Sequence, residues 1–85
     1  MEQINQDNYF EDLLTKYEKL VFSICYRMTN NYFDAQDLTQ ETFFSVYRVI
    51  ESFDKKNEKA YITRITTNKC LDHLKKAERR TIPRG

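Results

Sequence analysis

DAQDLTQETFFSVYRVIESF, residues 34–53, is the stretch that decides the predicted fold of this 85-residue chain. Wound as an α-helix with about 3.6 residues per turn, it brings its mostly apolar side chains onto one arc that is wide enough to face a core. That arc consists of Ala35, Leu38, Thr42, Phe43, Val46, Val49, Ile50 and Phe53. We therefore predict an amphipathic helix that begins at Asp34 and ends near Phe53.

The opposite arc of this helix is polar, except for one aromatic residue. Its polar members are Asp37, Gln40, Glu41, Arg48 and Glu51. Phe44 lies among them, where core packing does not require an aromatic side chain. An exposed aromatic residue within a charged ridge is typical of a surface that a partner covers. The alternative is a solvated polar face with one stray Phe, because single exposed apolar residues are common.

A second helix is predicted before this one. Residues 1–7 are polar and expected to fray, whereas Asn8 can cap a helix, with Glu11 in the capping-box position. Phe22 and Tyr26 lie on a second face of this helix, which indicates contact with two neighbours. The core-facing stripe consists of Phe10, Leu13, Leu14, Tyr17, Leu20, Val21, Ile24, Cys25 and Met28. A turn at residues 29–31 separates the two helices, and Asn31 or Asp34 is expected to cap the second one.

A third helix is predicted from Ala60 to about Arg80, where Pro83 prevents its continuation. Its inward stripe consists of Ile62, Thr66, Cys70, Leu74 and Ala77. The chain contains a single Gly and a single Pro, which argues against a turn-rich β architecture. We therefore predict an all-α fold, a compact bundle of three principal helices with a core of modest size.

Several classes of protein are excluded by composition. No apolar run approaches the roughly 20 residues that a membrane span needs, and the polar, acidic N-terminus is not a signal peptide, so we expect a cytoplasmic protein without membrane insertion. Cys25 and Cys70 lie far apart in no metal-binding or redox spacing, and we expect two reduced thiols, with a disulfide as the unsupported alternative. Asp37 and Glu41 stand at a spacing that could share a metal, but the Glu-x-x-His companions of a di-iron site are absent. With no Gly-rich phosphate loop and no nucleophile–base pair, we predict no enzymatic activity and no cofactor.

Charge is distributed unevenly along the chain. Residues 1–58 contain 11 acidic and 6 basic residues, a net charge of −5, whereas residues 59–85 contain 8 basic and 2 acidic residues, a net charge of +6. Such an asymmetry favours a nucleic-acid surface at the C-terminal end. Basic helix ends are also common without any ligand, because cations favour the C-terminal end of the helix dipole, although this explains two or three charges more easily than eight.

The outer ridge of the third helix carries the types of side chain that bind single-stranded DNA. It consists of Tyr61, Arg64, Asn68, Asp72, Lys75 and Arg79. An aromatic ring can stack on a base, an amide can bond to a base edge, and cations neutralise phosphate. Asp72 fits this role poorly and is expected to orient Arg64, Lys75 or Lys76 at helical spacing. His73, at the edge of the inward stripe, is interpreted as a helix-packing residue.

Three runs of this sequence, DAQDLTQETF with its closing FD, LVFSICYRMT and YITRITTNKCLDHLKK, resemble region 2 of bacterial sigma factors, specifically the extracytoplasmic-function (ECF) group of the sigma-70 family. The resemblance covers roughly residues 10–80. It implies that the helix starting at Asp34 docks on the clamp-helix coiled coil of the largest subunit of core RNA polymerase. The implied polymerase-binding residues are Asp37, Gln40, Glu41, Phe44 and Arg48.

The resemblance also implies that this domain recognises and melts the promoter −10 element by capturing the non-template single strand. The loop Asp54–Lys59 would form a pocket for a flipped base, and the third helix would read the DNA. The implied DNA-binding residues are Lys55, Lys56, Asn57, Lys59, Tyr61, Arg64, Asn68, Lys69, Asp72, Lys75, Lys76, Arg79 and Arg80. The loop departs from the family pattern, because it contains no Phe and because Tyr61-Ile62 stand where Trp-Leu is usual.

Two further expectations follow from the resemblance. Residues 8–80 would form the helical domain, and residues 81–85 would begin a linker to a second DNA-binding domain. An anti-sigma factor would be a further partner. The alternative is a helical protein-interaction module that does not bind DNA.

Overall fold

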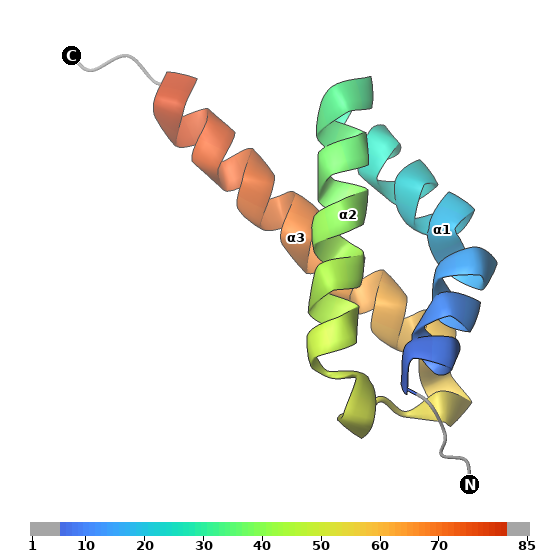
Figure 1. The fold of residues 1–85 in the computed structure, drawn as a ribbon. Helices are drawn as coiled ribbons and strands as arrows, with labels where there is room; N and C mark the ends of the chain where they lie inside the picture. The colour runs from blue at the N-terminus through green and yellow to red at the C-terminus, as the bar shows by residue number, and fades with distance from the viewer. Residues whose placement is uncertain (1–5, 82–85) are drawn as a thin grey trace, which may run out of the picture.

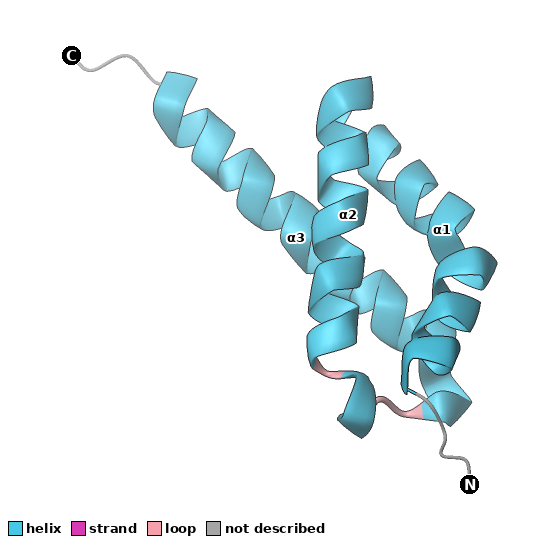
Figure 2. Ribbon diagram, viewed as in Figure 1, coloured by secondary structure: helices cyan, strands magenta, loops and turns pink. Residues whose placement is uncertain are grey.

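Three long α-helices dominate this computed structural model, which describes residues 6–81 and the side chains of residues 7–78. Helix α1 spans Gln6–Thr29, α2 spans Tyr32–Arg48 and α3 spans Glu58–Thr81. Two single 3-10 turns, η1 (Ile50–Ser52) and η2 (Lys55–Asn57), connect α2 to α3. The described part contains no strand (Figure 2), and the predicted all-α bundle of three helices is confirmed.

The helices are arranged so that α2 has neighbours on two sides. Helices α1 and α2 run antiparallel as a hairpin, while α3 crosses behind α2, and its C-terminal turns project beyond the bundle (Figure 1). The buried apolar residues come from all three helices and from the connection between α2 and α3. They are Leu13, Val21, Cys25, Ala35, Leu38, Phe43, Val46, Ile50, Phe53, Ile62 and Cys70.

The predicted core arc of α2 is confirmed except at Val49, which is 37% exposed. The reason is that the helix ends at Arg48, earlier than predicted, and the backbone of Val49 leaves the helical region (φ −111°, ψ 19°). The 3-10 turn that follows redirects the chain, so Ile50 and Phe53 still reach the core. Of the predicted core-facing stripe of α1, three residues are buried (Leu13, Val21 and Cys25), and six are half-buried: Phe10, Leu14, Tyr17, Leu20, Ile24 and Met28.

Local capping explains where α2 begins. Asn31 is the N-cap, because its side-chain Oδ1 accepts a hydrogen bond of 2.9 Å from the backbone N–H of Asp34. Of the two predicted caps, Asn31 and Asp34, the structure confirms Asn31, so α2 begins at Tyr32 and not at Asp34. Asn30, with φ 56°, adopts the left-handed conformation in which helices commonly end.

The other predicted boundaries shift by a few residues. Helix α1 begins at Gln6, so Asn8 lies inside it and is not its N-cap. Gln6 and Asp7, expected to fray, are helical, whereas residues 1–5 lie outside the described residues. Helix α3 begins at Glu58, which removes the last two residues from the predicted loop. Residues 82–85 of the expected linker also lie outside the described part.

Candidate functional site

The polar ridge of α2 is open to solvent along its whole length. Its five predicted partner-binding residues are all exposed: Asp37, Gln40, Glu41, Phe44 and Arg48. Phe44 is 71% exposed, which confirms that it does not belong to the core. An apolar ring flanked by two carboxylates and an amide can be buried against a partner that offers an apolar contact and a cation.

A second exposed aromatic surface lies where α1 meets α2, and only part of it was expected from the sequence. Phe22 stacks on Tyr26 (ring centroids 6.0 Å apart) and meets Tyr32 edge-on (5.6 Å), and Tyr32 in turn meets Phe33 (5.7 Å). Phe33 is 77% exposed. An open hollow of about 530 Å³ runs from this cluster to Gln40, lined by Glu18, Lys19, Phe22, Tyr32, Gln36, Thr39 and Gln40. The cluster therefore adjoins the polar ridge of α2.

The connection from α2 to α3 is built around Asp54. Its carboxylate accepts hydrogen bonds from the side-chain amide of Asn57 (2.8 Å) and from the backbone N–H of Lys56 (3.0 Å). These two bonds, the first one above all, hold the pKa of Asp54 below its usual range. The result is a tight turn that presents Lys55, Lys56 and Asn57 to solvent.

The aromatic wall beside this turn is formed by two rings. Phe53 lies directly before the predicted loop, and its ring stacks on that of Tyr61 with centroids 4.6 Å apart and planes 9° from parallel. One face of Tyr61 is thereby covered, and its side chain is half-buried. An open hollow of about 320 Å³ lies next to this pair, lined by Asp54, Asn57, Ala60, Tyr61 and Arg64.

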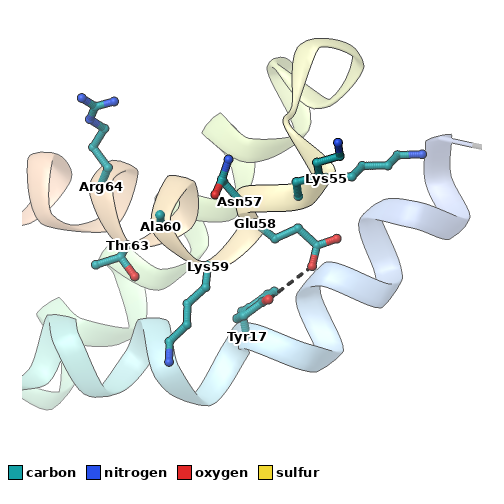
Figure 3. A pocket seen from close by; sticks show the side chains of 9 residues that line it. Tyr17, Lys55, Asn57, Glu58, Lys59, Ala60, Thr63 and Arg64 are labelled. Carbon is teal, nitrogen blue, oxygen red and sulfur yellow. Dashed lines mark hydrogen bonds between the residues drawn. The ribbon is translucent and has the colours of Figure 1, made fainter.

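A larger hollow, of about 750 Å³, lies where the start of α3 faces α1 (Figure 3). It brings four predicted DNA-binding cations, Lys55, Lys56, Lys59 and Arg64, to one surface together with Tyr17, Asn57, Glu58, Ala60 and Thr63. Inside it, the carboxylate of Glu58 accepts a hydrogen bond of 3.2 Å from the hydroxyl of Tyr17. Sequence analysis did not anticipate this contact.

Further along α3, a fourth hollow, of about 480 Å³, follows the outer ridge of the helix. It is lined by Ile65, Asn68, Lys69, Leu71, Asp72 and Lys75. Asn68, Asp72, Lys75 and Lys76 are exposed, whereas Lys69 is half-buried. Of the three partners proposed for Asp72, the structure pairs it with Lys76, at 3.6 Å.

Two of the predicted DNA-binding residues, Arg79 and Arg80, belong to α3 near its C-terminal end. Their side chains lie outside the described residues. Leu71, which lines the fourth hollow, is 46% exposed.

His73 and the two cysteines have structural positions. His73 Nε2 lies 3.3 Å from Asp34 Oδ2 and so ties α3 to the start of α2, in agreement with its predicted packing role. Cys25 and Cys70 are free thiols that are fully buried. Burial, followed by the hydrogen bond with Cys25, raises the pKa of Cys70 to about 12, and such a thiol is a poor nucleophile.

Among residues 6–81 there is no group of three or more His, Cys, Asp or Glu side chains that could hold a metal ion. Within the same range, none of the helices combines the length and the apolar character needed to cross a bilayer.

The geometry therefore consists of an acidic ridge with an exposed Phe on α2 and a cation-rich surface with three hollows on α3 and the preceding turn. A family model described as sigma-70 region 2 matches residues 13–80. The chain belongs to the sigma-70 region 2 family. This assignment confirms the resemblance seen in the three sequence runs.

The curated relatives of this region 2 chain described here are all named ECF RNA polymerase sigma factors. The ECF RNA polymerase sigma factor SigE of Mycolicibacterium smegmatis is 34% identical over 70 residues, which cover 82% of this chain and 27% of the relative. SigG of Mycobacterium tuberculosis, described likewise, is 39% identical over 81% of this chain and 19% of the relative. SigW of Bacillus subtilis, also an ECF sigma factor, is 35% identical over 79% of this chain and 36% of the relative.

The chain thus spans about a fifth to a third of the length of these relatives. No solved structure gave a significant match.

Proposed function

We propose that this chain is the promoter-melting domain of an RNA polymerase sigma factor. It docks on core polymerase through α2 and recognises and melts the −10 element by capturing the non-template strand. The observation that carries this proposal is the separation of two surfaces on different helices. Acidic and apolar groups occupy the ridge of α2, whereas cations, an amide and an aromatic wall occupy α3 and the turn before it.

Docking uses the ridge of α2. Phe44 supplies apolar area at the centre of the contact, and Asp37 and Glu41 attract cations of the clamp-helix coiled coil. Gln40 adds hydrogen-bonding groups, and Arg48 lies at the end of the ridge. Such a contact leaves α3 free to meet the DNA.

DNA capture uses the turn and α3. The cations Lys55, Lys56, Lys59 and Arg64 surround one hollow, where they neutralise phosphates of the displaced strand. An unpaired base enters the hollow beside Tyr61, and the Asn68 amide reads a base edge further along α3. These contacts offset an unstacking cost of a few kcal/mol per base. The chain itself hydrolyses no nucleotide in this process.

The expected partners are core RNA polymerase, promoter DNA and an anti-sigma factor. An inhibitor of that class acts by covering the surfaces described above, and the domain works in the cytoplasm with the polymerase. The aromatic cluster around Phe33 favours the second candidate function, a protein-interaction module without DNA binding, because it offers apolar area that DNA capture does not require.

The deciding experiment is a competition assay with the chain bound to core polymerase. We expect an unpaired non-template −10 strand to compete better than the same sequence as a duplex. Base substitutions that strongly weaken competition should all lie within the −10 element. Polymerase binding without any strand preference would favour the interaction module. No polymerase binding would overturn the proposal.

A further inference from the structure

The side chain of Glu58 is held by three donors from another helix. Its side chain is only 16% exposed. The Tyr9 hydroxyl donates to Oε2 at 2.8 Å, the Tyr17 hydroxyl to Oε1 at 3.2 Å, and Lys16 Nζ to Oε1 at 3.4 Å. All three donors come from α1, and Figure 3 shows Tyr17 and Glu58 facing each other across the two helices.

This carboxylate is ionised in spite of its burial. Burial opposes ionisation, but the hydrogen bonds from Tyr9, Lys16 and Tyr17 outweigh it and hold the pKa of Glu58 below its usual range. Hydrogen bonds to an ionised acceptor are stronger than those between neutral groups. The contact between α1 and Glu58 is therefore specific as well as stabilising.

The position of Glu58 gives this contact its significance. Glu58 is the first residue of α3 and directly follows η2. At the other end of the same turn, Lys55 Nζ lies over the ring of Tyr9, 4.8 Å from its centroid. Tyr9 therefore contacts both the first residue of η2, Lys55, and the residue that follows η2, Glu58.

None of these groups lines the hollow beside Tyr61. That hollow is walled by Asp54 and Asn57 on the turn and by Ala60, Tyr61 and Arg64 on α3. A change in the path of residues 54–58 would alter its shape without removing any of its walls. Side chains of α1 can therefore influence the shape of this hollow without lining it, although Tyr17 lines the larger hollow next to it.

We propose that Tyr9, Tyr17 and Glu58 are positioning residues that fix the turn at residues 54–57 and thereby set which base the hollow beside Tyr61 accepts. The inference rests on the proposed function and names a control of its specificity. It assigns a role in base selection to α1, a helix that carries none of the predicted DNA-binding residues.

The test uses the double substitution Tyr9→Phe with Tyr17→Phe, which keeps both rings and removes only the hydroxyls. The chain is bound to core polymerase, and its affinity is measured for −10 strands that carry each base at each position. We expect the preference at one strand position to fall by roughly tenfold, which corresponds to about 1.4 kcal/mol. The salt dependence and the affinity for polymerase should not change. Glu58→Gln keeps one acceptor oxygen and should lose less of the preference.

A second measurement, hydrogen exchange of the free chain, tests the positioning itself. The double variant should exchange faster at residues 54–60, with α2 unchanged. Tyr47→Phe is the matched control, because its hydroxyl donates to Asp7 (2.9 Å) on an exposed surface, and it should alter neither measurement.

Two results would overturn the inference. The first is an unchanged base preference in the double variant. The second is an equal loss of affinity for all four bases together with a lower melting temperature, since that is the signature of a purely structural contact. Absence of strand binding by the unmodified chain is a different result, because it would overturn the proposed function and the base-selecting role with it.

Discussion

At the scale of single residues, the core contains one polar atom whose position is unusual. The hydroxyl of Thr42 is fully buried on α2 and has no hydrogen-bond partner among the described residues. The other buried threonine, Thr66, donates to the carbonyl of Ile62 at 2.6 Å. A buried hydroxyl without a partner costs free energy, whereas a satisfied one does not.

Thr42→Val should therefore stabilise the fold, because it keeps the branched shape of the side chain and removes the unpaired hydroxyl. We expect the free energy of unfolding to rise by about 1 kcal/mol, measured by urea denaturation. Thr66→Val is the matched control and should give no gain, since it removes a satisfied group. A loss of stability in Thr42→Val would show that the Thr42 hydroxyl has a partner in solution.

At the scale of elements, α2 and α3 each make a separate prediction about partners. On α2, Phe44→Ala should weaken binding to a clamp-helix fragment by about 2 kcal/mol or more if Phe44 is the central contact. Gln40→Ala and Glu41→Arg should weaken it as well. The helical content of all three variants, measured by circular dichroism, should stay unchanged.

Phe33→Ala is the control for the α2 ridge. It removes an aromatic residue that is even more exposed, at 77%, in the first turn of the same helix, one turn before the ridge begins at Asp37. Binding should survive this change. If Phe33→Ala abolishes binding and Phe44→Ala does not, the polymerase contacts the aromatic cluster and we have assigned the wrong surface.

On α3, Asn68 and Lys75 line the same hollow but should act differently. Lys75→Ala should weaken binding to all −10 strands alike and lower the salt slope by about one unit, because a lysine contacts phosphate. Asn68→Ala should change the preference among bases and leave the slope intact. Competition assays at two salt concentrations separate these results. If both variants lose affinity uniformly across the strands and show equal salt slopes, Asn68 does not read a base.

At the scale of the whole molecule, the stability of the bundle depends on side chains that reach its centre. Leu13, 1% exposed, is such a side chain. Leu13→Ala should lower the free energy of unfolding by about 2–5 kcal/mol, which circular dichroism in denaturant would measure. Leu20→Ala, at a half-buried position of the same helix, should cost clearly less. Similar losses of stability in the two variants would mean that α1 packs on the rest of the bundle in another register.

Helical periodicity predicted most of this fold, because it records which side of a helix is apolar. It placed Ala35, Leu38 and Val46 in the core and left Phe44 outside. It failed at Val49, because the backbone turns there and the period no longer applies. Periodicity also did not choose between Asn31 and Asp34 as the cap of α2, because both side chains can cap a helix.

The candidate site was predicted less completely than the fold. Periodicity placed Asn68, Asp72 and Lys75 on one exposed ridge, since they share a helix. It gave no sign that Tyr9 and Tyr17 bond to Glu58, 49 and 41 residues away. Such contacts depend on how helices cross, and the pattern within one helix does not contain that information.

The projection of α3 beyond the bundle has a consequence for the helix–coil equilibrium of its C-terminal turns. Leu74 and Ala77 are only half-buried there, and short helical segments with little packing are marginal in water. Lys75 and Lys76 are exposed cations on these turns, and phosphate can neutralise them. DNA should therefore complete this end of the helix as it binds, and the ellipticity of the complex would then exceed that of its separate components.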